Sequence, residues 1–466
     1  MKSLLQSNFS PYVCQLLDSL NRLIGPIHLV GRVLRQALRN DFAVREIDLL
    51  VASSLSLCHQ KLLEGGFPQV VMGKRHNSLL LPLKGDTPLK IIHISTLRHR
   101  PGHQATVEED LLHRDITFNA MAFPWPDGKL IDPFGGQQDL QENRVRLVNG
   151  SDTLREEPLK ALRFYRFIMQ FAAESDPRDL ELTEQTHLGR VSQERLRAEM
   201  DRFLSLPLTK KNSVALMRRF FNSPLGEQIL PELATLKEVR DTNGDTRSAW
   251  EKSLDMMFAV SRPREGEKVS LLDLRWAALL HLVGKTACVI APEDSVTPAP
   301  LLPGQMEETL RLVDTILERL HFSKRRQQRL HRLIAHLEFD DSPSDRALKR
   351  LIENDIPIEG LFRLIKAKRE TQPNLVSAEL ERMAAECHRT LRRCQAISEA
   401  QNRLSPDDLA ISGGELLDLV RQKPGAWIGQ LQEWLVDQVT ENPQNNRREV
   451  LEKLIREWIA QHGLPS

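Results

Sequence analysis

The stretches HRDITFNAMA (residues 113–122) and DPFGGQQDL (residues 132–140) decide how the rest of this chain is interpreted. The first puts a cation and a carboxylate, Arg114 and Asp115, at the start of an apolar-patterned segment. The second sets two glycines inside a frame of aspartates, which predicts a tight turn. Two such specific patterns at close spacing rarely occur together by chance.

The two stretches resemble the head of the tRNA nucleotidyltransferase and poly(A) polymerase family. These are the class II polymerases, which extend RNA 3′ ends without a nucleic-acid template. The family's first motif usually reads Arg-Arg-Asp and its second reads Asp-x-x-x-Gly-x-x-Asp-Leu; this chain keeps the second and places His113 at the first arginine. The resemblance implies that Arg114 and Asp115 contact the sugar and phosphates of a nucleotide. A buried ion pair that anchors the head is the alternative.

The spacing of apolar residues predicts two regions of different secondary structure. Before Gly150, short β-rich runs predict strands at 27–30, 47–51, 70–72, 78–83 and 89–94, with a helix over 33–38. After Gly150, apolar residues recur every three or four positions and predict helices over 154–171, 189–205 and 212–222, with breaks near 261–266, 292–304 and 341–343. We therefore expect an α+β fold, with an N-terminal nucleotidyltransferase-type mixed sheet as the head and an all-helical neck, body and tail.

The resemblance extends to the helical region and gives expected domain boundaries. Residues 192–200 are similar to the family's neck segment, and residues 409–416 and 424–429 are similar to the tail of bacterial CCA-adding enzymes. We expect a catalytic head (1–148), a neck that recognises the nucleotide base (149–225), a body that binds RNA (226–390) and a tail that binds tRNA (391–466). Poly(A)-adding members tend to end in a strongly basic extension, which this sequence lacks.

Composition indicates an ordinary water-soluble protein. The 466 residues are 41% hydrophobic and 27% charged, with a net charge of +1, so any RNA-binding surface must come from local clusters of basic residues such as 324–326. A solvated helix face is the alternative for such a cluster. The five cysteines show no Cys-x-x-Cys spacing, which favours a reducing compartment. Without a signal peptide or a long apolar run, we expect a cytoplasmic protein that does not bind membranes, and its oligomeric state is left open.

Glu46 and Asp48 are the candidate catalytic and metal-binding residues. Nucleotidyl transfer uses carboxylates that hold divalent ions, and residues i and i+2 of a strand share one face. The sequence Glu46-Ile47-Asp48 has this spacing directly before an apolar run and predicts a Mg²⁺ site. The family usually has two aspartates here, and its third carboxylate corresponds to His93, a poor magnesium ligand. An acidic strand entry at the surface is the alternative.

The turn after the first strand is a candidate phosphate-binding element. The family reads Gly-Gly-x-Val-Arg-Asp there, and residues 31–36 of this chain read GRVLRQ. Gly31 permits a tight turn that leaves backbone N–H groups free for phosphate at a helix N-terminus. Arg35 matches the family arginine, Arg32 replaces the second glycine and can contact phosphate directly, and Gln36 replaces the acid.

A second group of candidate nucleotide-binding residues begins the first long helix. Glu157, Lys160 and Arg163 are spaced by three, which predicts one shared helical side. In the family, an Asp and an Arg at the first two positions read the Watson–Crick edge of CTP or ATP, so the resemblance gives those roles to Glu157 and Lys160. Arg163 matches a further family arginine that meets the triphosphate. A well-capped helix with ion pairs is the alternative.

One further resemblance is incomplete. Residues 276–285 are similar to the His-Asp-x-Gly-Lys signature of metal-dependent phosphohydrolases, but Leu282 stands where the aspartate belongs. We therefore expect no phosphohydrolase activity, and structural roles for His281 and His336.

The sequence thus predicts an RNA nucleotidyltransferase that adds C, A or both to tRNA 3′ ends from CTP and ATP, with Mg²⁺ and release of pyrophosphate. Two other outcomes from the same family are a poly(A) polymerase and an enzyme that adds only C or only A. The third alternative is a catalytically degenerate RNA-binding paralogue, which is favoured by five departures from the family at Arg32, Gln36, Glu46, His93 and the Glu157/Lys160 pair.

Overall fold

The computed structural model of this chain describes residue 5 and residues 9–40, 45–73, 78–83, 89–98, 105–208, 212–240, 245–260, 269–288, 304–338, 343–372, 377–401, 406–420, 422 and 425–462. Its contacts divide the chain into two compact units, Met1–Leu337 with Ala367–Pro373, and Glu338–Lys366 with Asn374–Ser466. The predicted breaks at 261–266 and 292–303 lie outside the described residues, as does most of 341–343. The predicted domain boundaries at 148, 225 and 390 stay predictions.

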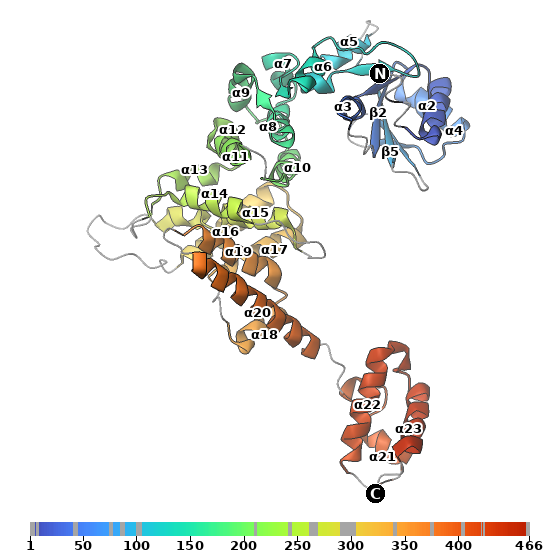
Figure 1. Cartoon of the computed structure of the whole chain (residues 1–466), viewed down its shortest axis with the longest axis vertical. Helices are drawn as coiled ribbons and strands as arrows, with labels where there is room; N and C mark the ends of the chain where they lie inside the picture. The colour runs from blue at the N-terminus through green and yellow to red at the C-terminus, as the bar shows by residue number, and fades with distance from the viewer. Residues whose placement is uncertain are drawn as a thin grey trace, which may run out of the picture. The chain divides into compact units, whose positions relative to one another are not determined.

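The head consists of short strands and helices. Its helices are α2 (Pro11–Ile24), α3 (Arg32–Leu38), α4 (Leu55–Glu64), α5 (Val107–Leu111), a 3-10 turn (Thr117–Asn119) and α6 (Gly136–Gln141). Its strands are β1 (Ile27–Val30), β2 (Glu46–Val51), β3 (Val71–Gly73), β4 (Ser78–Pro82), β5 (Ile91–Thr96), β6 (Ala122–Pro124) and β7 (Arg144–Val145). In Figure 1, α2 and α4 lie on one side of the sheet and α3 lies on the other.

The head sheet is mixed, as the sequence predicts. Among the described residues its strand order is β3-β4-β5-β2-β1-β6, with β2 and β5 parallel and the other neighbours antiparallel. The five strand predictions are confirmed, with ends shifted by at most two residues, and α3 confirms the helix over 33–38. The register places Asp48 beside His93 of β5 and beside Val30 of β1.

The two faces of β2 have different roles. Alternation puts Ile47, Leu49 and Val51 on one face, where each is at most 1% exposed. Asp48 and Leu50 share the other face, and Leu50 packs in an apolar cluster with Leu111 and Ala120. Because those last two residues flank the 113–119 segment, the cluster holds that segment over the face that carries Asp48.

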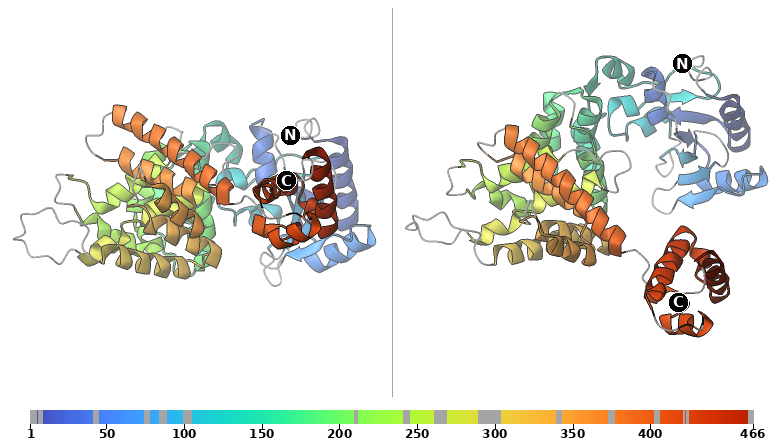
Figure 2. Two further views of the ribbon diagram at one scale, coloured as in Figure 1. Left: turned by 90° about the horizontal axis from the view of Figure 1, so that it is seen from below. Right: turned by 60° about the horizontal axis from the view of Figure 1, so that its bottom comes forward.

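Helices dominate after the head. In the first unit they are α7 (Gly150–Glu156), α8 (Lys160–Phe171), α9 (Pro177–Glu184), α10 (Gln193–Leu204), α11 (Ser213–Asn222), α12 (Pro224–Ile229), α13 (Pro231–Ala234), α14 (Ala249–Ala259), α15 (Leu271–Leu280), α16 (Gln305–Arg319) and α17 (Lys324–Ala335). The predicted helices at 189–205 and 212–222 are confirmed. Figure 2 shows this succession of helices from two further directions.

Two details of the helical prediction are wrong. The single helix over 154–171 is two helices, because Pro158 has no N–H to donate and forces Glu157 into an extended conformation (φ −139°, ψ 90°). The region is also not purely helical, since β8 (Glu174–Ser175) pairs in parallel with β7. This small ladder joins the end of α8 to the head.

The second unit contains α18 (Asp345–Glu353), α20 (Ser377–Gln401), α21 (Gly413–Val420), α22 (Trp427–Glu441) and α23 (Arg448–His462); α19 (Ile358–Glu370) is divided between the units. The last three helices have an apolar core of their own, with Leu431, Leu435 and Leu451 fully buried beside Trp427 and Trp458. This core is separate from that of the head. No described helix is long and apolar enough to cross a bilayer.

Candidate active site

The two acidic residues of β2 lie on one face of the strand, as their spacing predicts. The Glu46 side chain is 48% exposed and lies 3.5 Å from Nη1 of Arg32. Asp48 is more buried and lies next to the turn at Gly31, where a Cβ atom would stand 3.5 Å from Asp48 Oδ2. That distance is an ordinary van der Waals contact, so it is the backbone that favours glycine at this turn: Gly31 has φ +70°, a conformation that side chains disfavour.

Burial raises the pKa of Asp48, and the nearby His93, Arg114 and Arg32 side chains oppose that rise. These cations favour the ionised form of Asp48, which is the form that can bind a metal ion. Of the predicted pair, Asp48 lines the cleft described below and Glu46 stands at its edge, paired with Arg32.

The 113–119 segment supplies the opposite wall of the site. Asp115 Oδ1 accepts hydrogen bonds from Nδ2 of Asn119 (2.9 Å) and from the N–H of Ile116 (3.0 Å). Burial works against ionisation of Asp115, but Arg163 and these hydrogen bonds lower its pKa below the ordinary value. Arg114 does not pair with Asp115; its guanidinium lies 3.5 Å from Asp110. Asp115 therefore faces the site as a fixed, ionised acceptor.

The glycine-containing motif at 132–140 supports this wall from behind. Asp132 accepts the N–H groups of Gly136 (2.7 Å) and Gln137 (2.9 Å) and so caps the start of α6. Gly136 packs so closely on Thr117 that a Cβ atom would stand 2.4 Å from the Thr117 carbonyl oxygen. These contacts connect the second motif directly to the first.

Asp139 completes this support. It is fully buried and accepts hydrogen bonds from Oγ1 of Thr117 (2.6 Å) and from the guanidinium groups of Arg144 and Arg146. Burial raises its pKa, but these three donors outweigh burial and lower the pKa overall. The motif that is most intact in the sequence therefore positions the site and does not itself line the cleft.

Arg35 lies under the cleft in an aromatic cage. Its guanidinium carbon is 5.2–5.9 Å from the ring centres of Phe118, Phe167 and Phe171, and Nη1 bonds Oδ1 of Asn119. Burial lowers the pKa of Arg35 to about 10, so it remains a cation at neutral pH. The rings hold this cation in place while one edge of it reaches the cleft.

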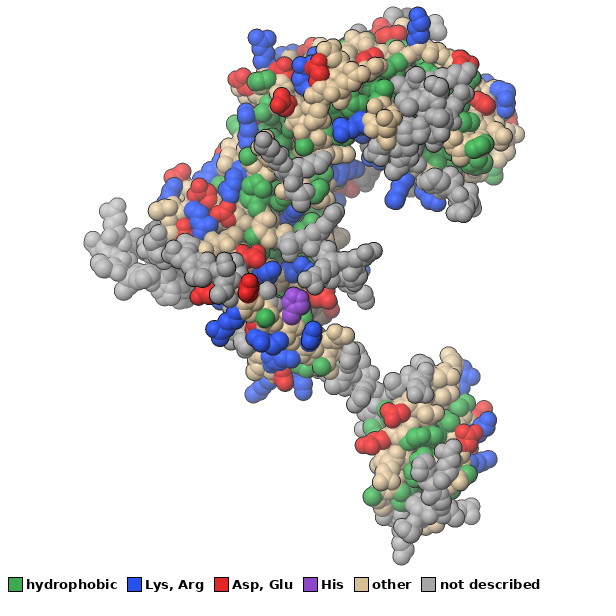
Figure 3. All heavy atoms as spheres, viewed as in Figure 1, with side chains coloured by type: hydrophobic (Ala, Val, Ile, Leu, Met, Phe, Trp, Pro, Cys, Tyr) green, Lys and Arg blue, Asp and Glu red, His purple; other side chains and the backbone are tan. Residues whose placement is uncertain are grey.

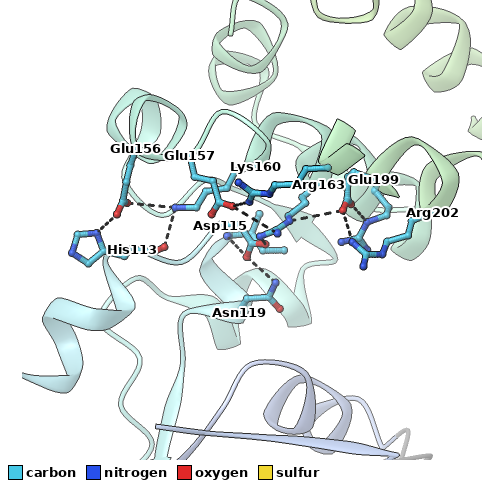
Figure 4. Close-up of polar contacts among 12 residues, drawn as sticks. His113, Asp115, Asn119, Glu156, Glu157, Lys160, Arg163, Glu199 and Arg202 are labelled. Carbon is cyan, nitrogen blue, oxygen red and sulfur yellow. Dashed lines mark hydrogen bonds and ion pairs between the residues drawn. The ribbon is translucent and has the colours of Figure 1, made fainter. Parts of the chain in front are cut away.

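Glu157, Lys160 and Arg163 meet at the cleft, although only the last two lie on one helix. Glu157 contacts Arg195 of α10 and lies 3.9 Å from Arg163. Arg163 also lies 4.0 Å from Asp115 and 3.9 Å from the fully buried Glu199 of α10. Figure 4 shows Arg163 between these carboxylates.

Lys160 is held differently from its two neighbours. Its side chain is 2% exposed, and Nζ donates to the carbonyl oxygen of His113 (2.9 Å) and lies 3.5 Å from Glu156. Glu156 in turn lies 2.8 Å from Nδ1 of His113 (Figure 4). Burial lowers the pKa of Lys160, and Glu156 partly offsets this effect. Lys160 thus ties α8 to the head.

Side chains from the Gly31 turn, β2, the 113–119 segment and α8 surround one polar cleft of about 270 Å³. Its described lining holds seven arginine or lysine side chains and three carboxylates: Arg32, Arg35, Arg98, Arg114, Lys160, Arg163, Arg166, Asp48, Asp115 and Glu157. Of the ten predicted site residues, only Glu46 is not part of the lining. Such an excess of cations suits a polyanionic ligand.

Several lining residues were missed by the sequence reasoning. Arg166 continues the three-residue spacing that runs through Lys160 and Arg163, so a longer pattern would have found it. Asn119 stands within the quoted 113–122 stretch, and no role was given to it. Arg98 lies beyond β5, where no local pattern indicates that it bonds Glu156 and the His113 carbonyl oxygen.

The described residues hold no cluster of three or more His, Cys, Asp or Glu side chains placed to bind a metal ion. Mg²⁺ is commonly held by only one or two carboxylates, with water and substrate phosphates completing its shell. Asp48 and Glu46, on one face beside a cationic cleft, fit that limited role. His281, by contrast, is buried in the body with its ring bonded to the Ala278 carbonyl oxygen, as expected of a structural histidine.

Comparison with known proteins identifies the family of this chain. The family described as Poly A polymerase head domain matches residues 27–146. The A-adding tRNA nucleotidyltransferase of Deinococcus radiodurans is 30% identical over 70% of this chain and 73% of its own length. The Multifunctional CCA protein of Halorhodospira halophila is 33% identical over 43% of this chain, and the match spans less than half (45%) of that relative.

Solved structures show the same fold. The Bacillus stearothermophilus CCA-adding enzyme in complex with CTP aligns over 97% of this chain and 99% of its own, with a TM-score of 0.56 and 18% identity. The Thermotoga maritima CCA-adding enzyme complexed with tRNA aligns over 98% of both chains, with a TM-score of 0.53 and 20% identity.

The fold is that of the class II CCA-adding nucleotidyltransferases. The chain belongs to the tRNA nucleotidyltransferase and poly(A) polymerase family, as the 113–140 motifs predicted.

Proposed function

We propose that this protein transfers nucleotides from ATP, CTP or both to the 3′ end of tRNA. In this reaction the terminal 3′-hydroxyl attacks the α-phosphate, the bond between the α-phosphorus and the bridging oxygen breaks, and pyrophosphate leaves. The observation that carries the proposal is the cleft, in which seven cations and the Asp48 carboxylate meet beside a glycine turn.

The cations of the cleft are suited to a triphosphate. Arg35 is fixed by its aromatic cage and Arg32 stands at the start of α3, so both can meet phosphate beside Gly31. Arg114 and Arg163 approach from the other side of the cleft. Because their positions are set by ion pairs and packing before any ligand arrives, little reorganisation is needed when charge develops at the α-phosphate.

Asp48 and Glu46 are proposed to hold Mg²⁺. When bound there, the ion would lower the charge of the phosphates and favour ionisation of the attacking hydroxyl. Asp115 is proposed to accept a hydrogen bond from the ribose, since it is an ionised acceptor held by Asn119 and Ile116. Glu157 and its basic neighbours, Lys160 among them, are proposed to surround the base.

The second unit carries a surface suited to RNA. Lys and Arg side chains gather over α18 and α20 (Figure 3), including the exposed Arg346, Lys349, Arg350, Arg389 and Arg392. The whole chain has a net charge of only +1, so this cluster is a local concentration of positive charge. It can bind duplex RNA through the backbone phosphates and the shape of the RNA helix. We propose that the body (226–390) and the tail (391–466) bind tRNA, and that the catalytic head (1–148) and the neck (149–225) precede them in the sequence.

Addition of A alone is the second candidate. The A-adding relative matches 70% of this chain, whereas the Multifunctional CCA protein of Ectopseudomonas mendocina matches 46% of it and half of its own length. Addition of A to tRNA that already ends in CC would be the corresponding reaction.

The test uses three tRNAs, ending before CCA, after C and after CC, each given one labelled nucleotide at a time. A CCA-adding enzyme extends all three in order, and an A-adding enzyme extends only the last. Asp48→Asn should lower incorporation at least about a hundredfold. If Asp48→Asn incorporates label as fast as the unaltered chain, the catalytic assignment is wrong, and absence of incorporation by the unaltered chain would favour the degenerate RNA-binding paralogue.

A further inference from the structure

Two basic side chains near Glu157 differ in what they can offer to a nucleotide base. Lys160 is 2% exposed, and its ammonium group is occupied by the His113 carbonyl oxygen and by Glu156. Arg195 is 46% exposed, and among the described residues its guanidinium bonds only Glu157, through Nη2. The remaining N–H groups of Arg195 are therefore available, while those of Lys160 are largely used within the protein.

The position of Arg195 is fixed by α10. Ser192 caps this helix and accepts the Arg195 N–H (3.4 Å). One turn further on, the fully buried Glu199 bonds Arg166 of α8 and so fastens α10 against that helix. Arg195 is thereby held at the break between α7 and α8, where Glu157 leaves helical geometry and presents its carboxylate to the cleft.

Glu157 lines the cleft and Arg195 contacts it, and among the described residues the pair has one carboxylate oxygen and several guanidinium N–H groups without a partner. Within the described part of the chain, both basic partners of Glu157 contact Oε1, which leaves Oε2 able to accept a hydrogen bond. A carboxylate oxygen beside a guanidinium N–H matches an amino group beside an unprotonated ring nitrogen. Adenine and cytosine carry that pair on their Watson–Crick edges, whereas guanine and uracil carry a carbonyl oxygen beside an N–H.

We propose that Arg195, together with Glu157, is the specificity-determining pair that selects ATP and CTP over GTP and UTP, and that Lys160 is a positioning residue. This inference rests on the proposed function and deepens it. It revises the expectation from sequence, in which Lys160 takes the donor role. We assign the donor role to Arg195 because its planar guanidinium remains accessible, whereas the ammonium group of Lys160 is bonded to the His113 backbone.

The test measures equilibrium binding of ATP, CTP, GTP, UTP and inorganic tripolyphosphate to the full chain. Arg195→Lys keeps the charge next to Glu157 but loses the fork, so it separates a reading role from an ordinary ion pair. We expect the preference for ATP and CTP over GTP and UTP to shrink by about tenfold or more, with tripolyphosphate affinity changed less than about twofold.

Two further variants serve as controls. Arg219→Lys alters another exposed arginine (53%) that bonds one carboxylate, Glu184 at 2.6 Å, and should change neither quantity. Lys160→Met should weaken all four nucleotides to a similar extent. The inference is overturned if Arg195→Lys keeps the full preference, or if Lys160→Met abolishes it while tripolyphosphate still binds normally.

Measurements on the unaltered chain distinguish failure of the Arg195 assignment from failure of the proposed function. If it adds label to tRNA but Arg195→Lys discriminates normally, only the assignment of Arg195 is wrong. If it neither extends tRNA nor prefers any base, the proposed function fails, and this inference fails with it.

Discussion

Gly136→Ala tests whether the glycine-containing motif positions the active site. A Cβ atom at residue 136 would stand 2.4 Å from the Thr117 carbonyl oxygen and 2.8 Å from Cα of Phe118, both of which are backbone atoms that cannot turn aside. Gly136 opens α6, and its φ lies outside the range that disfavours a side chain, so the cost is purely one of space. Overpacking of this kind destabilises by about 1–3 kcal/mol, or about 5- to 150-fold in the ratio of folded to unfolded head.

The same displacement should reach the cleft. Thr117 lies two residues from both Asp115 and Asn119, and Asn119 bonds both Arg35 and Asp115. A shift of the Thr117 backbone therefore moves the Asp115 carboxylate together with Asn119, which holds Arg35. We expect nucleotide affinity to fall by about tenfold or more.

A matched glycine with open surroundings provides the control. Gly429 lies exposed within α22, and a Cβ atom there would meet nothing within 4 Å. Gly429→Ala should leave nucleotide binding unchanged and stabilise its own helix by about 0.5–1 kcal/mol, because alanine loses less conformational entropy. Hydrogen exchange of head and tail peptides, with titration of labelled ATP, measures both effects. If Gly136→Ala matches the unaltered chain in head protection and ATP affinity, this account of the motif is refuted.

Three further predictions concern other parts of the same machinery. Arg326→Met should lower the free energy of unfolding of the first unit by about 3 kcal/mol. Arg326 is 16% exposed and bonds Asp201 (2.7 Å) and Asp273 (2.6 Å), so both carboxylates would lose a shared partner. Urea unfolding followed by hydrogen exchange measures this loss, and equal protection of the variant and the unaltered chain would contradict it. Asp139→Asn should make the stability of the head less dependent on pH in acid. The fold lowers the pKa of Asp139, so the ionised carboxylate stabilises the head above the ordinary pKa of 3.8, and this stabilisation is lost as the pH falls through the lower pKa of the folded state. Parallel unfolding curves for both proteins below pH 4 would disprove that contribution. Arg35→Lys should weaken tripolyphosphate binding by about tenfold, since lysine lacks the flat group that packs on Phe171; titration calorimetry gives the value, and unaltered affinity would show that the cage has no part in binding.

Sequence patterns predicted those features that depend on local physics. Alternation along 46–51 correctly predicted that Glu46 and Asp48 share one face of a strand. The apolar runs of the head correctly predicted five of its strands. The resemblance puts His93 at the family's third carboxylate position, and the register of β2 and β5 sets His93 beside Asp48.

Features that depend on distant contacts were less accessible. The spacing of Glu157, Lys160 and Arg163 predicted one shared helical side, which is wrong for Glu157, because Pro158 ends the helix and leaves Glu157 extended; the three side chains nevertheless line the same cleft. Whether a basic side chain is exposed depends on groups far away in the chain: His113 lies 47 residues from Lys160, and Glu157 lies 38 residues from Arg195. No window of local sequence contains both partners of either contact.

The separate core of the last three helices has a practical optical consequence. Three of the six tryptophans, Trp427, Trp434 and Trp458, belong to or pack against that core, and none of the described cleft-lining residues is a tryptophan. Intrinsic fluorescence of this protein will therefore report chiefly on melting of its C-terminal bundle and of the body, and a nucleotide that enters the head will scarcely change the emission.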